Sequence, residues 1–194
     1  MEREYDALAI RELGTGAGYR RPTQAEAAKV SMDSPALEVM TDLTRATPAT
    51  IRPQAPLAGA NQFMITRGVR LLLVVDDHEK VLGLITATDL LGERPIRVAI
   101  ERGLRRDELS VGDIMIDAEH VDVLTLAQVE AARVGHVVET LRRAGRQHAL
   151  VVDAERMVRG IFSLTQIARQ LGVAVPAAAG EVARTFSEIE AAIR

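Results

Sequence analysis

The stretch VLGLITATDL (Val81–Leu90) recurs 77 residues later as VRGIFSLTQI (Val158–Ile167). Glycine and threonine keep their places in both phrases, and Ser163 occupies the position equivalent to Thr86. Asp89, the only charged residue of the first phrase, becomes Gln166 in the second. Self-similarity at one long period, present only twice, indicates a tandem pair of α+β units and not an open-ended solenoid.

The residues around each phrase predict the same elements in both copies. RLLLVVD (70–76) and HALVVD (148–153) are apolar runs bounded by turn residues, so each should form a buried β-hairpin with the phrase that follows. Short extended runs are expected in ATIRP (49–53) and VDVLTL (121–126). The apolar spacing and the Pro and Gly signals predict helices at Leu57–Arg67, from Thr86–Asp89, at Pro95–Gly103, and along Val134, Val137, Val138 and Leu141.

These patterns divide the chain into five segments. We expect an N-terminal tail (1–35), a first repeat (36–92), a helical linker (93–108), a second repeat (109–172) and a C-terminal amphipathic helix (173–194). The last helix is predicted from the apolar residues Val182, Phe186, Ile189 and Ile193, spaced by four, three and four. Its apolar face needs a surface to cover, either on its own domain or on a second chain.

Composition narrows the classes of function. The 194 residues include 47% hydrophobic side chains and carry a net charge of -3, so no global positive field invites nucleic acid. Aromatic residues make up 3%, too few for base-stacking platforms. Cysteine is absent, which excludes disulfides and thiolate chemistry. No apolar stretch reaches the ~20 residues that span a bilayer, so we expect a cytoplasmic protein that does not enter membranes.

The ends of the two phrases allow two interpretations. TATD (86–89) and SLTQ (163–166) both have the form of a helix capping box, worth about 1 kcal/mol, which we expect at both places. A helix N-terminus also favours an anion, and a neighbouring carboxylate can hold a vicinal diol, which together describe a ribonucleotide. Glutamine can complete a cap but cannot form charge-assisted bonds to a ribose. The first copy should therefore bind, and the second should be weakened or lost.

In their order and in their doubling, these motifs resemble those of a tandem pair of CBS domains. The CBS domain is a regulatory module first described in cystathionine β-synthase. The resemblance covers residues 36–171, roughly, and is carried by VGDIM (111–115), RLLLVVDDHEKVLGLITATDL (70–90) and HALVVDAERMVRGIFSLT (148–165). It implies an α+β fold with one β-α-β-β-α unit per copy. The two units would pack sheet to sheet around a pseudo-twofold axis, with two clefts where adenosine nucleotides often bind.

The resemblance also implies roles for particular residues. It assigns a hydroxyl near the ligand's phosphate to Thr86, a ribose-binding carboxylate to Asp89 and a phosphate-binding group to Arg70, which could instead be a solvated or ion-paired surface residue. Weaker candidates are Met40 and Met115, which could equally be core packing, together with Ser163 and Gln166.

The second copy keeps only the hydroxyl of this set. Gln147 stands at the position equivalent to Arg70. Arg146 and His148 flank it and could substitute, but strand alternation is expected to point them elsewhere. The resemblance therefore implies one good nucleotide cleft per chain.

Other chemistry finds little support in the sequence. The four histidines form no zinc motif, and the acidic residues after the first hairpin strand, Asp76, Asp77 and Glu79, are explained by a solvated turn. No nucleophile elbow or P-loop lysine is present, so we expect neither an enzyme nor a metal protein.

The sequence thus predicts a regulatory module, without catalysis, that binds AMP, ADP or ATP between the repeats. It would act as a homodimer and in trans, on an unidentified enzyme or transporter. The alternatives are a structural dimerisation or protein-interaction module without a ligand, and a nucleic-acid binder that uses the paired arginines, which the acidic net charge disfavours.

Overall fold

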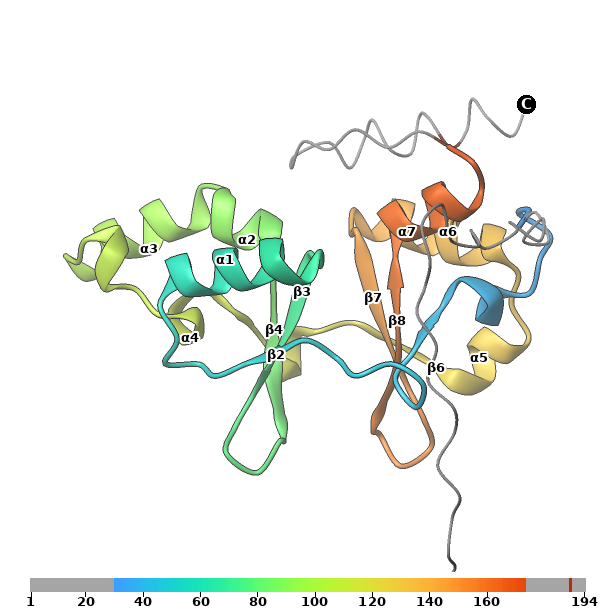
Figure 1. The fold of residues 1–194 in the computed structure, drawn as a ribbon, viewed down its shortest axis with the longest axis horizontal. Helices are drawn as coiled ribbons and strands as arrows, with labels where there is room; N and C mark the ends of the chain where they lie inside the picture. Colours follow the sequence, from blue (N-terminus) through green and yellow to red (C-terminus); the bar gives the residue numbers. More distant parts are fainter. Residues whose placement is uncertain (1–29, 174–188, 190–194) are drawn as a thin grey trace, which may run out of the picture.

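The structure is a computed structural model that describes residues 30–173 and residue 189 (Figure 1). Most of the predicted tail and of the predicted C-terminal helix, including Val182, Phe186 and Ile193, lies outside the described residues.

The chain alternates short strands and helices. Its first part contains η1 (Ala36–Val39), β1 (Thr41–Asp42), β2 (Thr50–Ile51), α1 (Leu57–Arg67), β3 (Leu71–Val75), β4 (Val81–Thr86), α2 (Ala87–Leu91) and α3 (Arg94–Arg102). Its second part contains η2 (Arg106–Glu108), α4 (Val111–Ile114), β5 (Ile116–Asp117), η3 (Ala118–His120), β6 (Val123–Thr125), α5 (Leu126–Glu130), α6 (Val134–Ala144), β7 (His148–Val152), β8 (Val158–Ser163) and α7 (Leu164–Gln170).

The elements predicted within residues 30–173 are confirmed, but several short elements were not predicted, among them α4 and α5. Both hairpins, the helices α1, α3 and α6 and the helix start after Thr86 lie where the patterns placed them. The sequence missed α5, because its five residues continue the extended pattern of β6 and contain too few turns for an apolar period to appear. A capping box on Thr125 and Gln128 starts this helix.

Two four-stranded sheets share one strand order, offset by one repeat. One sheet has the order β2-β3-β4-β5, and the other has β6-β7-β8-β1. In each sheet, one edge strand pairs parallel with the first strand of the hairpin. The other edge strand pairs antiparallel with the second strand of the hairpin. Strand β1 opens the first repeat but pairs with β8, and β5 opens the second repeat but pairs with β4. Each sheet therefore contains strands of both repeats, related by a pseudo-twofold axis.

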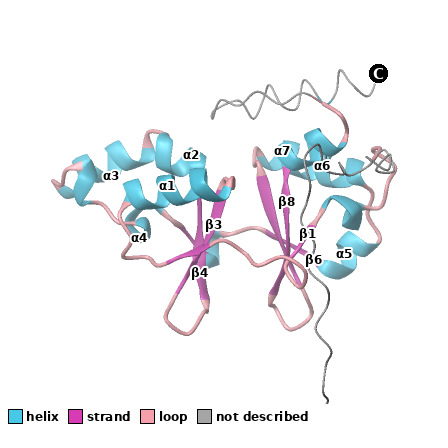
Figure 2. Ribbon diagram, viewed as in Figure 1, coloured by secondary structure: helices cyan, strands magenta, loops and turns pink. Residues whose placement is uncertain are grey.

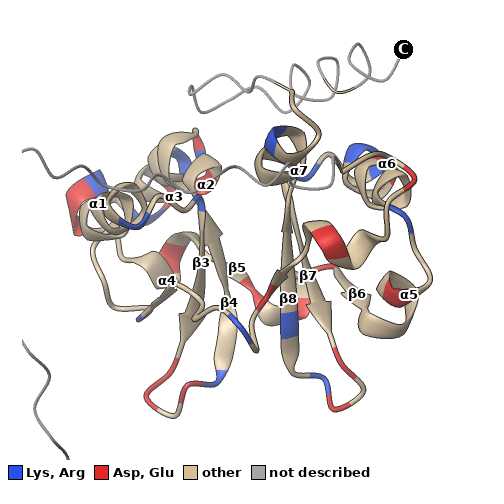
Figure 3. Cartoon of the chain, turned by 45° about the vertical axis from the view of Figure 1, so that its right-hand side comes forward, with Lys and Arg blue, Asp and Glu red and all other residues tan. Residues whose placement is uncertain are grey.

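The sheets pack face to face, and helices cover their outer faces (Figures 1 and 2). On β3, Leu72 and Val74 face the helices, while Leu71, Leu73 and Val75 face the other sheet and meet Leu150 of β7, Val158 and Ile161. All five strand residues are buried, which explains the continuous apolar run. Charged residues gather at the hairpin tips and on the helices (Figure 3).

Strand exchange extends into the cores. Ala36 and Val39 pack in the core of the second hairpin, together with residue Ile189, which is 1% exposed. Val111 and Ile114 pack in the core of the first hairpin. The linker helix α3 is also part of that core, through the buried Ala99. The spatial halves thus differ from the sequence repeats 36–92 and 109–172, which stay predictions as units.

Candidate ligand cavity

A cavity of about 200 Å³ lies between the two sheets at the ends of the strands. Its apolar lining comes from both halves: Leu71, Leu84 and Ile116 from one sheet, and Val123, Leu124 and Leu150 from the other. Polar side chains at its edge come from the start of α2, from the segment before β6 and from the start of β7. An apolar interior with a few polar groups at one side is the usual form of a small-molecule site.

Thr86 and Asp89 lie together at this edge. Asp89 Oδ2 accepts hydrogen bonds from the backbone N–H of Thr86 (2.9 Å) and from its hydroxyl (2.6 Å), and the Asp89 N–H donates to Thr86 Oγ1 (3.3 Å). The predicted capping box is therefore present in the first copy. Within the described part of the chain, Asp89 Oδ1 has no hydrogen-bond partner, so this oxygen remains able to accept a diol hydroxyl.

The second copy lacks the predicted cap. Ser163 precedes α7 but makes no side-chain cap hydrogen bond, so the expectation of a capping box there is wrong. Gln166 instead accepts a hydrogen bond through Oε1 from Thr41 Oγ1 of β1 (3.1 Å). The longer amide reaches the exchanged strand and no longer turns back to its own helix start. Neither Ser163 nor Gln166 lines the cavity.

One part of the cavity wall is formed by Arg146, Gln147 and His148. The expectation that strand alternation would turn Arg146 and His148 away is wrong, for two reasons. Strand β7 begins only at His148, so alternation does not apply to the turn before it. His148 itself pairs with Ser163 as Leu71 pairs with Thr86, and it therefore faces the other sheet as Leu71 does.

Two further polar residues of the cavity, His120 and Asp122, were not predicted from the sequence. They lie after β5, and only the exchange of that strand brings them beside the first copy's phrase. Asp122 Oδ2 lies 3.9 Å from an Arg146 guanidinium nitrogen, and the two side chains are 88% and 46% exposed. An ion pair this exposed contributes little to stability, so Arg146 remains available to a ligand.

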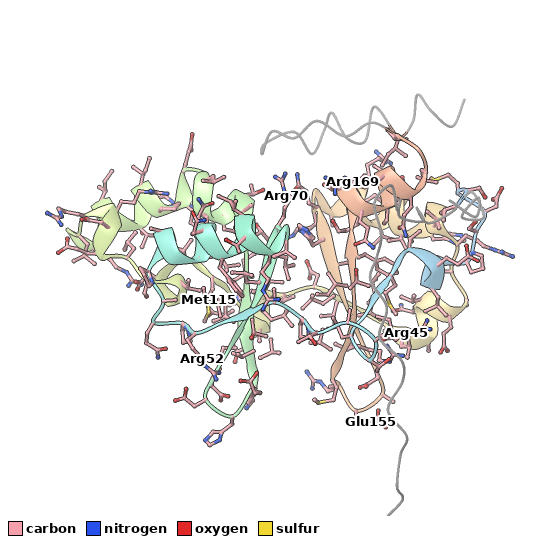
Figure 4. The ribbon with its side chains drawn as sticks, viewed as in Figure 1. Arg45, Arg52, Arg70, Met115, Glu155 and Arg169 are labelled. Atoms are coloured by element: carbon pink, nitrogen blue, oxygen red, sulfur yellow. The ribbon has the colours of Figure 1, made fainter. Side chains whose placement is uncertain are left out.

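Arg70 does not line the cavity, although it immediately precedes β3 and lies beside the second half (Figure 4). Its carbonyl accepts the N–H of Ala87 (2.9 Å), which fixes the start of α2 against β3. Its Nε is the one buried side-chain nitrogen or oxygen without a partner in the described part of the chain. The structure thus brings Thr86 and Asp89 together in the cavity and leaves Arg70 outside its lining.

Burial, and to a lesser extent the positive charge of Arg70, lower the pKa of His148 to about 4. His148 is therefore neutral near pH 7 and can donate or accept one hydrogen bond inside the cavity. Arg70 thus lies near this ring, although its side chain is not part of the wall.

Met40 and Met115 pack in the cores and are not in the cavity lining. A Cβ on Gly160 would lie 2.3 Å from Met40 Sδ, so the absence of a side chain there makes room for this methionine. The carbonyl of Met115 accepts a hydrogen bond from Arg94 (3.0 Å). Both contacts favour a packing role.

Residues 30–173 and 189 contain no group of three His, Cys, Asp or Glu side chains placed to hold a metal ion. None of the helices formed by those residues is long and apolar enough to cross a membrane.

Comparisons with known proteins agree with this architecture. The model of the CBS domain family matches residues 29–96. An uncharacterized conserved protein from Pyrococcus horikoshii is 23% identical in its crystal structure, with a TM-score of 0.56 over 77% of this chain and 100% of that one. A comparison with curated proteins finds no match.

Two crystal structures with bound ligands are also similar. CBSX2, from Arabidopsis thaliana, in complex with AMP is 20% identical, with a TM-score of 0.51 over 70% of this chain and 94% of that one. The CBS domain pair of protein MJ0100, in complex with 5-methylthioadenosine and S-adenosyl-L-methionine, is 22% identical, with a TM-score of 0.51 over 73% and 98%. The matching family model, the doubled topology and the shared fold lead to one conclusion: residues 29–96 match the CBS domain family, and the chain has the fold of a tandem CBS-domain pair.

Proposed function

We propose that this protein is a regulatory module that binds one adenosine-containing ligand per chain in the cavity between its sheets. The observation that carries the proposal is the Asp89 carboxylate, held at the cavity edge by Thr86 through one oxygen and without a partner on the other. A carboxylate so placed suits a ribose diol, and the apolar lining beyond it suits a purine ring.

AMP, ADP and ATP are the ligands we favour, since each combines adenine, ribose and phosphate. Two similar structures support an adenosine ligand, because one is a complex with AMP and the other a complex with 5-methylthioadenosine and S-adenosyl-L-methionine. The phosphate would lie toward Arg146 and His148, which line the cavity together with Asp89. Helix α2 has only five residues, so its dipole adds little to this attraction.

We further propose that the protein acts without catalysis, in trans, on an enzyme or transporter. Among the hydrogen bonds of the described residues, none joins a hydroxyl to a histidine ring, and the Thr86 hydroxyl and Asp89 are used in a helix cap. A ligand held between sheets that exchange strands contacts both halves at once, so binding can shift their relative position. That shift is the signal a partner would detect.

A second candidate function is a ligand-free dimerisation or interaction module, and one observation favours it. Ile65 on α1 and Ile96 and Ile100 on α3 are 65%, 56% and 76% exposed. Apolar side chains spaced four apart on a helix and left in water are typical of a contact surface. The same surface supports a homodimer under either function.

The test is calorimetric titration of the wild type and of Asp89→Asn with AMP. Asparagine keeps an oxygen that can accept the Thr86 hydrogen bonds but removes the charge that holds the diol. We expect about one AMP per chain for the wild type, and a loss of roughly 1–3 kcal/mol of binding free energy, or 5- to 150-fold in affinity, for the variant.

Asp113→Asn is the matched control. Asp113 forms the same capping box with Ser110 but does not line the cavity. Its Oδ2 accepts hydrogen bonds of 2.8 Å from the N–H and from the hydroxyl of Ser110. It should bind AMP as the wild type does. Absence of heat with AMP, ADP and ATP alike would support the ligand-free module instead.

A further inference from the structure

The charges around the cavity limit how many phosphates its ligand can carry. Two carboxylates line it, Asp89 and Asp122, against one guanidinium, Arg146. His120 and His148 also line it, and burial keeps the pKa of His148 at about 4, so this ring adds no positive charge near pH 7. The described lining contains no lysine.

The end of helix α6 adds to the negative side of this balance. Ala144, the last residue of this 11-residue helix, and its cap Gly145 both line the cavity. The carbonyl end of a helix carries roughly half a negative charge, which disfavours an anion beside it. The cationic residues of the same turn do not reverse this, because Arg142 and Arg143 pair with Glu139 and lie outside the lining.

Asp122 also lies beside the one guanidinium of the wall. Its Oδ2 lies 3.9 Å from Arg146, and both side chains border the same cavity. A phosphate bound to Arg146 would therefore lie next to Asp122. Arg70, whose charge reaches His148, supplies one further cation near the wall. One phosphate can be balanced by these two arginines, whereas a second and a third would find no cation among the described residues of the lining.

We propose that the cavity selects an adenosine derivative with at most one phosphate. Asp122, which lies beside Arg146, is the residue that lowers the affinity for di- and triphosphates. This inference rests on the proposed function and narrows it from AMP, ADP or ATP to AMP and less charged adenosine derivatives. Asp122 determines specificity here by its charge, while Asp89 provides the affinity for ribose.

The size of the effect of Asp122 follows from Coulomb's law. If the Asp122 carboxylate lies ~6 Å from the ligand's charge in water-like surroundings, it changes the ligand's affinity about threefold for each unit of that charge. Each phosphate added to AMP brings about one further negative charge, so ATP should bind roughly tenfold more weakly than AMP. Asp122→Asn should raise the affinity for both ligands and increase the ATP-to-AMP affinity ratio at least about threefold.

The experiment is calorimetric titration with adenosine, AMP, ADP and ATP, in buffer without divalent cations, on the full chain. The proteins are the wild type, Asp122→Asn and the control Glu119→Gln, which removes an exposed carboxylate three residues away that does not line the cavity. A second pair is Arg146→Gln with the control Arg143→Gln, an arginine of the same region that is 77% exposed.

The expected order of affinity in the wild type is AMP, then ADP, then ATP. Asp122→Asn should compress that order, Glu119→Gln should not, and Arg146→Gln should weaken AMP binding about tenfold while leaving adenosine binding unchanged. Binding of ATP as tight as that of AMP would overturn the inference and leave the proposed function standing. So would an Asp122→Asn protein indistinguishable from Glu119→Gln. Absence of binding for all four ligands would overturn both.

Discussion

Replacing Gly83 with alanine should destabilise the fold far more than the same change at its counterpart, Gly160. The two glycines hold the same place in the repeated phrase, and each lies where an exchanged strand crosses: Gly83 pairs with Asp117 of β5, and Gly160 pairs with Asp42 of β1. What a new methyl group would meet differs between them. At Gly83 it would lie 2.1 Å from the backbone oxygen of Ile116, and at Gly160 it would lie 2.3 Å from the sulfur of Met40.

This difference sets the magnitudes. To reach an ordinary contact of 3.4 Å, β5 would have to retreat 1.3 Å from β4, and its short ladder would break. Overpacking of this kind costs about 1–3 kcal/mol, and each lost backbone hydrogen bond adds about 1 kcal/mol. We expect a loss of about 2–4 kcal/mol for Gly83→Ala. The flexible Met40 side chain can move to another rotamer, so Gly160→Ala should cost about 1 kcal/mol or less.

Urea unfolding followed by circular dichroism measures both values under one set of conditions. The lower entropy of the unfolded alanine chain offsets either loss by at most about 1 kcal/mol, and equally in the two variants. Because β5 carries Ile116 into the cavity lining, Gly83→Ala should also weaken AMP binding. Equal stability of the two variants, or a more stable Gly83→Ala protein, would refute the reasoning that the glycine exists to admit a crossing backbone.

Two other predictions concern stability. His148 has a pKa of about 4 in the folded state against 6.5 for a free histidine, so its neutral form is favoured by folding and its contribution is lost as pH falls through this range. At most about 3 kcal/mol of the free energy of unfolding should be lost between pH 6.5 and pH 4. His148→Leu, which introduces the residue type of Leu71, should flatten this pH dependence in urea titrations. An unchanged pH profile would contradict the burial of this ring. Ile114→Ala should cost about 2–5 kcal/mol, and hydrogen exchange should quicken in β3 and β4, whose core Ile114 joins, before it does in β7 and β8; faster exchange confined to β7 and β8 would contradict the exchange of elements between halves.

Much of the fold could be predicted from the sequence because its signals are local. The buried run of β3, the capping box of Thr86 and Asp89, and the glycine after each of α1, α3 and α6 all depend on near neighbours along the chain. Gly68, Gly103 and Gly145 end α1, α3 and α6 with positive φ angles, as helix-terminating glycines do.

The exchange of β1 and β5 could not be predicted in this way. Strands of two residues carry no period, and the partner of each is decided by packing between distant segments. The Met40 and Met115 candidates depended on that packing. So did Gln166, whose amide is bonded by Thr41 of the exchanged strand and not by its own helix start.

The site was predicted in part for the same reason. Thr86 and Asp89 belong to one motif, and the structure places both at the cavity. His120, Asp122 and Arg146 come from two other segments, and only the three-dimensional fold brings them to the same wall. Arg70 was assigned a phosphate-binding role by resemblance. It immediately precedes β3 and lies beside the cavity lining.

The central claim is that the change from Asp89 to Gln166 leaves one ligand site per chain and not two. Equilibrium dialysis of the wild-type protein against radiolabelled AMP, carried to saturation, counts the sites directly. We expect one AMP bound per chain at saturation, with a dissociation constant that rises about 5- to 150-fold in Asp89→Asn and is unchanged in Gln166→Ala. Two AMP molecules per chain, or one whose affinity is unchanged in Asp89→Asn and lost in Gln166→Ala, would contradict this.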